Sequence, residues 1–191
     1  MLICFVGRHG AGKSTIGAKL AKYGYKHLSV GLLRRIGISG IYPSDVPASL
    51  IAAFRRTKAG EPLSISISEK LLKYALTFDK CILDGFPASV DHLKMLPSNA
   101  TIALVCAPKS VRNLRLQHRS ESTKRIWTPG GYSTREQELA EVLRIARVTR
   151  KTIFISNADD GTIAIEKILH LLQHKPTNSI ATPFVCATNQ S

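Results

Sequence analysis

The feature that most constrains this chain is a glycine-rich segment close to its start. The apolar run Leu2–Val6 leads into Gly7–Thr15, which reads GRHGAGKST and fits the pattern G-x-x-x-x-G-K-[ST]. In that pattern, a loop between a strand and a helix turns its main-chain N–H groups toward a polyphosphate. Glycine is needed because the backbone must approach the anion closely and adopt conformations that side chains disfavour. The segment therefore predicts a phosphate-binding loop.

The polar residues of this loop have distinct predicted tasks. Lys13 would neutralise the outer phosphates, the hydroxyl of Ser14 would bind Mg²⁺, and the next helix would add its N-terminal dipole. An incidental strand-to-helix turn is the alternative, but it leaves the lysine followed by serine unexplained. The predicted nucleotide contacts from the loop are Gly7, His9, Gly10, Ala11, Gly12, Lys13, Ser14 and Thr15.

Short apolar runs alternate with helical patterns along the chain, which is typical of βαβ units with a parallel sheet. The predicted strands are Leu2–Val6, His27–Val30, Cys81–Asp84, Thr101–Cys106 and Thr152–Ser156. The predicted helices are Lys13–Lys22, Lys70–Leu76 after a capping box at Ser66–Glu69, one starting near Pro108, Thr134–Arg150 and Thr162–Gln173. Because three of the strands are nearly all apolar, we expect helices on both faces of a five-stranded parallel sheet.

The length of 191 residues suits one domain with its own core. Between about residues 31 and 77 no strand pattern appears and three prolines interrupt the chain, which predicts a helical insert. Residues from about 119 to 135 include Pro129-Gly130-Gly131 and predict a short mobile lid. We therefore expect a single domain over residues 1–174, followed by a disordered tail over 175–191.

The charge balance points to an acidic partner. The chain has 27 Lys or Arg against 13 Asp or Glu, a formal net charge of +14, and the stretch Lys109–Lys151 alone holds eleven basic residues against four Glu. Such an excess favours nucleotides or a nucleic acid as partner. Hydrophobic residues make up 44% of the chain and charged residues 21%, as in ordinary soluble globular proteins.

The cysteines predict a reducing environment. Cys4, Cys81 and Cys106 each lie within an apolar run, where cysteine usually acts as a small buried hydrophobe, and no metal-binding spacing occurs. The N-terminal apolar run is too short for a signal peptide, and no run approaches the length of a membrane span. We expect a cytoplasmic protein that does not bind membranes.

A second motif allows a family to be suggested. Asp84 ends an apolar strand and begins Asp-Gly-Phe-Pro, and a carboxylate at that place can hold Mg²⁺ beside a phosphate loop, as in a Walker B site. Together with the loop, this motif resembles the adenylate-kinase-like nucleoside monophosphate kinases, a family of P-loop kinases. His27-Leu-Ser-Val-Gly31, Arg115-Leu-Gln-His-Arg119 and Asn157–Thr162 are similar to further segments of that family.

The resemblance implies a P-loop NTPase-type α/β fold with a helical acceptor-binding insert and a short lid. It also implies ATP as phosphate donor and Mg²⁺ as cofactor, with Ser14 and Asp84 as metal ligands. The implied catalytic residues are Lys13, Arg115, Arg119 and Arg135. Asn157 would contact the nucleotide base, and the implied acceptor-binding residues are Arg35, Gly85, Phe86 and His92.

Several positions depart from the family pattern on the acceptor side. Val30 and Leu32 replace a threonine and an aspartate, Ala88 replaces an arginine that grips the acceptor phosphate, and His92 stands where a glutamine reads adenine. These departures leave the identity of the acceptor open.

We expect an ATP-dependent phosphotransferase, most simply a nucleoside monophosphate kinase that transfers the γ-phosphoryl group of a Mg²⁺-bound nucleoside triphosphate. No general base is needed because a phosphate monoester is already an ionised nucleophile at neutral pH. One alternative is a P-loop kinase with another acceptor, such as a nucleic-acid end or a cofactor precursor. Another is a non-catalytic module that binds nucleotides or nucleic acid; nucleic acid is the less favoured partner.

Overall fold

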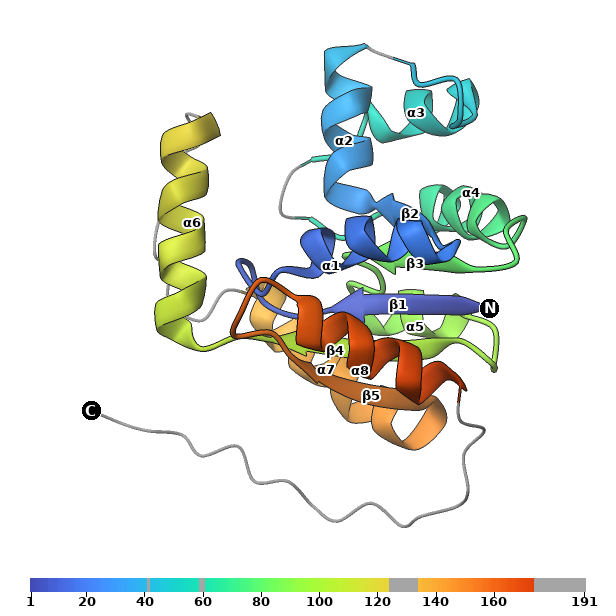
Figure 1. Cartoon of the computed structure of the whole chain (residues 1–191). Coiled ribbons are helices and arrows are strands. Elements are labelled where there is room, and N and C mark those ends of the chain that lie inside the picture. The colour runs from blue at the N-terminus through green and yellow to red at the C-terminus, as the bar shows by residue number, and fades with distance from the viewer. Residues whose placement is uncertain (41, 59–60, 124–133, 174–191) are drawn as a thin grey trace.

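The protein folds around a parallel five-stranded sheet (Figure 1). The computed structural model of the chain describes residues 1–40, 42–58, 61–123 and 134–173. The sheet order is β2-β3-β1-β4-β5, and the strands are β1 Leu2–Val6, β2 Lys26–Ser29, β3 Cys81–Asp84, β4 Thr101–Cys106 and β5 Lys151–Ser156. The predicted fold class is confirmed, and three of the five predicted strands have the predicted limits.

The helices cover both faces of this sheet (Figure 1). They are α1 Lys13–Leu20, which continues into a 3₁₀ turn at Ala21–Tyr23, α2 Val30–Ser39, α3 Ala48–Phe54, α4 Ile65–Ala75, α5 Val90–Met95, α6 Lys109–Thr123, α7 Thr134–Thr149 and α8 Thr162–Gln173. Alternation along β1 divides the core into two layers, because Ile3 and Phe5 pack with α1 and α8 whereas Cys4 packs with the insert and α7.

Some local predictions need correction. The helix expected at Lys70–Leu76 begins earlier, at Ile65, because the side chain of Ser64 and not that of Ser66 accepts a hydrogen bond from the helix N-terminus, at Ile67 N. Helix α5 follows the Asp-Gly-Phe-Pro motif and was not predicted. Most of the predicted lid and the whole of the predicted tail lie outside the described residues.

The sheet places the ends of three strands together. Asp84 pairs in register with Phe5 of β1 and with Ser29 of β2, so the end of β3 adjoins the start of the glycine-rich loop. Helix α6 stands apart from the sheet and faces α2 across the loop (Figure 1). Within the described residues no helix combines the length and apolarity needed to cross a bilayer, and the thiols of Cys4 and Cys81 are free.

Candidate active site

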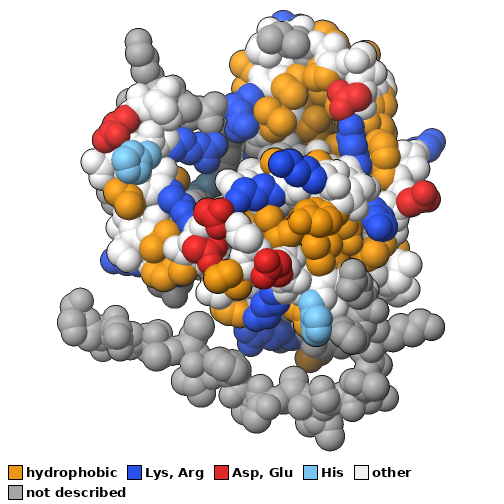
Figure 2. All heavy atoms as spheres, viewed as in Figure 1, with side chains coloured by type: hydrophobic (Ala, Val, Ile, Leu, Met, Phe, Trp, Pro, Cys, Tyr) orange, Lys and Arg blue, Asp and Glu red, His pale blue; other side chains and the backbone are white. Residues whose placement is uncertain are grey.

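A cavity lies over the glycine-rich loop, between α2 and α6. Its volume is about 420 Å³. Lys and Arg side chains gather around the hollow between these two helices (Figure 2). The charged residues that line it are Lys13, Arg34, Arg35, Asp84, Arg115 and Arg119. Five cations against one carboxylate make this cavity suited to a polyanion.

The loop has the backbone that phosphate binding requires. A side chain at Gly7 would place its Cβ 2.2 Å from the carbonyl oxygen of Val105, so only glycine fits there. Gly12 has φ +89° and lies immediately before α1. The first residues of α1, Lys13, Ser14 and Thr15, line the cavity, so the N-terminus of the helix is placed to bind an anion there. The Lys13 ammonium folds back over the loop and donates to Gly7 O at 2.8 Å and to Arg8 O at 2.9 Å.

Two side chains brace the loop from beneath. Asn157 follows β5 and is only 2% exposed, and its amide donates to Ala11 O at 2.8 Å. Arg115 of α6 donates to Gly10 O at 3.3 Å, to Asn157 O at 3.2 Å and to the carbonyl of Asp159. Both residues therefore hold the loop in shape, which is a support role in addition to the predicted base contact of Asn157 and catalytic role of Arg115.

The predicted metal ligands lie side by side. The Ser14 hydroxyl donates to Asp84 Oδ2, and His27 Nε2 lies 3.9 Å from the same oxygen. Burial raises the pKa of the Asp84 carboxyl, but His27, Lys13 and Ser14 together outweigh it, so the pKa lies below its ordinary value. Asp84 is therefore a carboxylate at neutral pH.

This pair of oxygen ligands fits Mg²⁺. The metal binds through one or two carboxylate or hydroxyl oxygens and takes its other ligands from phosphates and water. The described residues contain no cluster of three or more acidic, His or Cys side chains that could hold a metal alone. Ser14 and Asp84 would thus hold the ion only together with a bound polyphosphate.

The predicted acceptor-binding residues are divided between the cavity and the core. Arg35 and Gly85 line the cavity, as does Arg34, whose guanidinium also donates to Thr57 Oγ1 and Glu61 O. Phe86 and His92 are 0% and 1% exposed and stack on each other with ring centroids 4.7 Å apart. Their contact with an acceptor remains a prediction, and in this structure both rings are buried and neither lines the cavity.

His92 is fully engaged within the chain. Its Nδ1 accepts a hydrogen bond from Ala88 N at 3.2 Å, so Nε2 carries the proton and donates to Leu63 O at 2.8 Å. The ring therefore ties the Asp-Gly-Phe-Pro loop to the insert. Burial is the main cause that lowers the pKa of His92, which favours the neutral ring that these bonds require.

The remaining predicted arginines differ in position. Arg119 of α6 is exposed and lines the cavity opposite α2. Arg135 belongs to the first turn of α7, and its side chain lies outside the described residues. Both remain predictions as catalytic residues.

Two residues near the loop escaped the sequence interpretation. His27 packs against Gly17, where a Cβ would lie 2.5 Å from the ring, and Arg8 forms an ion pair with Glu136 of α7 at 3.3 Å. The His27-x-Ser-x-Gly segment offered a signal for the first. Arg8 occupies a variable position of the loop pattern, so its pairing could not be predicted from the motif.

Comparisons with known proteins agree with the fold. No family model matches the chain. An adenylate kinase from Borrelia turicatae (strain 91E135) is 33% identical to this chain over 97 residues. The match covers 50% of this chain and 46% of the relative, so the chain spans less than half the length of that relative. A solved shikimate kinase from Acinetobacter baumannii, in complex with shikimate, matches with a TM-score of 0.53 at 20% identity and covers 90% of this chain and 92% of that one. The predicted resemblance is thus confirmed at the level of the fold, which matches that of the shikimate kinase.

Proposed function

We propose that the chain is an ATP-dependent phosphotransferase, most simply a nucleoside monophosphate kinase that transfers the γ-phosphoryl group of a Mg²⁺-bound nucleoside triphosphate to a nucleoside monophosphate. The observation that carries this proposal is the convergence of Lys13, the Ser14–Asp84 pair and four arginines on one cavity of about 420 Å³. Similarity to an adenylate kinase over half the chain supports it.

The chain's own residues position the two polyanions. The loop N–H groups and Lys13 bind the donor phosphates, while Arg35 of α2 holds the acceptor phosphate. Arg119 stands on the opposite wall, where it stabilises charge that spreads over the transferring group; one such arginine contributes about 10³–10⁵ in rate. Arg115 and Arg135 complete the catalytic set, and Asn157 contacts the donor.

Ser14 and Asp84 would hold Mg²⁺, which would neutralise charge on the donor phosphates. No proton has to be removed from a phosphate monoester at neutral pH, so the residues act by orientation and electrostatics and by excluding water. We assign this activity to one domain, residues 1–174, with the insert at about 31–77 and the lid at about 119–135. The free thiols of Cys4 and Cys81 support a reducing, cytoplasmic location.

A second candidate is a P-loop kinase with a different acceptor. The observation that favours it is the acceptor side itself, where Ala88 provides no charge and His92 is closed off within the core. A nucleic-acid end or a cofactor precursor would then be the acceptor. A module that binds nucleotides or nucleic acid without catalysis is a third candidate, and the intact Lys13, Ser14 and Asp84 argue against it.

A coupled assay that measures ADP formation tests these candidates. The four common nucleoside monophosphates, a 5′-hydroxyl oligonucleotide and shikimate are offered in turn with Mg-ATP. Lys13→Ala is the negative control, and Lys19→Ala is its matched partner, because Lys19 lies on the same helix but pairs with Asp160 at 3.1 Å outside the cavity. Turnover with a monophosphate that Lys13→Ala abolishes supports the first candidate. Turnover with another acceptor alone selects the second, and no turnover with any acceptor contradicts the phosphotransferase proposal.

A further inference from the structure

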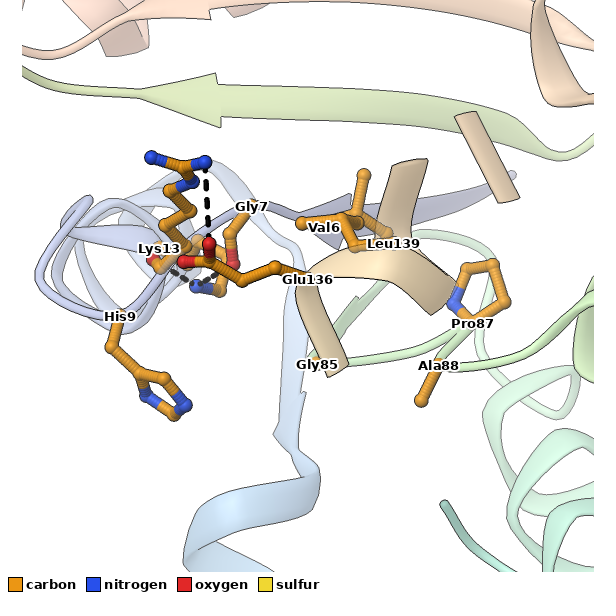
Figure 3. Close-up of a pocket in the computed structure, with 10 residues that line it drawn as sticks. Val6, Gly7, His9, Lys13, Gly85, Pro87, Ala88, Glu136 and Leu139 are labelled. Carbon is orange, nitrogen blue, oxygen red and sulfur yellow. Dashed lines mark hydrogen bonds and ion pairs between the residues drawn. The ribbon is translucent and has the colours of Figure 1, made fainter. Parts of the chain in front are cut away.

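A second, smaller cavity opens beside Lys13, between the glycine-rich loop and α7 (Figure 3). Its volume is about 70 Å³, which accommodates a compact group but not a nucleoside. The residues that matter here are Arg8, Lys13, Gly85, Ala88 and Glu136. In Figure 3 the Glu136 side chain extends toward Lys13, whereas His9 points away from both.

Arg8 and Glu136 join the loop to α7 across this cavity. Arg8 Nη2 lies 3.3 Å from Glu136 Oε2, and the two side chains are 46% and 28% exposed. Glu136 is the acidic residue in the first turn of α7, where the helix dipole favours a carboxylate. A guanidinium has five N–H donors, so one contact through Nη2 leaves others available for an oxyanion.

The position of Lys13 fixes which phosphate lies nearest to Arg8. The Lys13 ammonium rests on the carbonyls of Gly7 and Arg8, at the first end of the loop, and the lysine of such loops contacts the outer phosphates. The other end of the loop, Gly12, abuts Asn157. A bound triphosphate therefore points its terminal phosphate toward the Arg8 end.

We propose that Arg8 is a ligand of the donor's terminal phosphate and that Glu136 is the positioning residue that holds its guanidinium at the cavity. This inference rests on the proposed binding of a nucleoside triphosphate. The charges agree with this proposal, because Arg8 and Lys13 carry two positive charges against the one negative charge of Glu136, and the positive excess favours a further anionic group. Ala88 on the far wall contributes no charge.

The test compares equilibrium affinities for ATP and ADP, each with Mg²⁺, which requires no knowledge of the acceptor. Arg8→Ala should weaken ATP binding by about 10-fold to 100-fold, the usual effect of losing a charge-assisted hydrogen bond, while ADP binding changes by less than about 3-fold. Arg8→Lys restores the charge without the planar fork and should lose less. Arg144→Ala is the matched control, because Arg144 pairs with Glu141 on the same helix, away from both cavities.

Glu136 adds a second, independent readout. Glu136→Ala should weaken ATP binding by less than Arg8→Ala does, and it should add nothing in the Arg8→Ala background, because it acts only through Arg8. Equal losses for ATP and ADP, or no loss for ATP, overturn the assignment of Arg8. Tighter ATP binding by Glu136→Ala overturns the positioning role. Failure of the unaltered chain to bind either nucleotide refutes this inference together with the proposed function.

Discussion

The donor and acceptor sides proposed for the cavity over the glycine-rich loop differ in how their residues are supplied. On the donor side, a continuous segment from Gly7 to Thr15 provides the loop, the lysine and the serine, and all but Ala11 line the cavities. On the acceptor side, Arg35 and Gly85 reach the cavity, whereas Phe86 and His92 belong to the core. One side is a local motif and the other is an assembly of distant segments.

This difference indicates which groups of each side would determine ligand binding. The proposed donor side would bind phosphates through the main-chain N–H groups of one short segment and through its Lys13 and Ser14 side chains. The acceptor side depends on side chains from α2 and from the loop after β3, held in place by His92, which bridges Ala88 and Leu63. Substitutions on the donor side should therefore change rate more than stability, and those around His92 should do the opposite.

The largest effect is expected from Lys13→Met. Its ammonium donates to two loop carbonyls and the residue lines the cavity, so its loss should lower kcat by about 10³-fold or more. The melting temperature without nucleotide should change by no more than about 2 °C. Steady-state kinetics and thermal melts measure both. A decrease in kcat of less than 10-fold would contradict the expectation that donor-side substitutions affect rate more than stability.

Asp84→Asn should have the next largest effect, because it keeps the shape of the side chain and removes the charge next to Ser14. We expect kcat to fall by about 10²-fold to 10³-fold, with a higher Mg²⁺ concentration needed for half-maximal rate. A Mg²⁺ titration of the initial rate provides the measurement. An unchanged Mg²⁺ requirement would show that Asp84 is not a metal ligand.

The glycine-rich loop could be located from the sequence because its determinants are contiguous. Gly7, Gly12, Lys13 and Ser14 stand at fixed spacing, and the loop conformation follows from that spacing. The apolar strands were equally clear, since parallel strands buried on both faces contain little else. Asp84 could be placed because an Asp at the end of such a strand must lie at the carboxyl edge of the sheet.

The rest depended on tertiary contacts that no local pattern encodes. The partner of His92 is Leu63, 29 residues away, and the partner of Arg8 is Glu136, on a helix that follows the predicted lid. A histidine with both ring nitrogens satisfied is indistinguishable in sequence from one that faces a ligand. The start of α4 was misplaced for a related reason, because Ser64 and Ser66 are both credible caps and packing decides between them.

Asn157→Ala should give an intermediate effect on both properties, since it removes the brace under the loop. The carbonyl of Ala11 would lose a buried hydrogen-bond donor, which costs about 1–3 kcal/mol. We expect a lower free energy of unfolding by that amount and weaker ATP binding in parallel. Denaturant unfolding and ATP titration measure the two. Loss of affinity with unchanged stability would instead favour a direct contact of Asn157 with the nucleotide.

The smallest and most specific effect is expected at His92, in the pH dependence of stability. Its pKa is lowered in the folded chain, first by burial and then by Arg34, while Leu63 O, Asp91 and Glu138 oppose the shift. Below the ordinary histidine pKa of about 6.5, the unfolded chain therefore binds a proton that the folded chain does not.

The free energy of unfolding should consequently fall as the pH decreases from about 6.5 toward the folded pKa, by up to about 1.4 kcal/mol per pH unit, and should not depend on His92 above that range. His92→Gln should flatten this slope, because the amide does not titrate, and should lower stability at pH 7.5 by about 1–3 kcal/mol through the altered bonds to Ala88 and Leu63. Urea unfolding of both proteins from pH 5 to 8 measures the slopes. Equal slopes would mean that His92 does not hold the two acceptor segments together through its neutral ring. The proposed contrast, in which the acceptor side depends on a buried side chain for its stability and the donor side does not, would then be wrong.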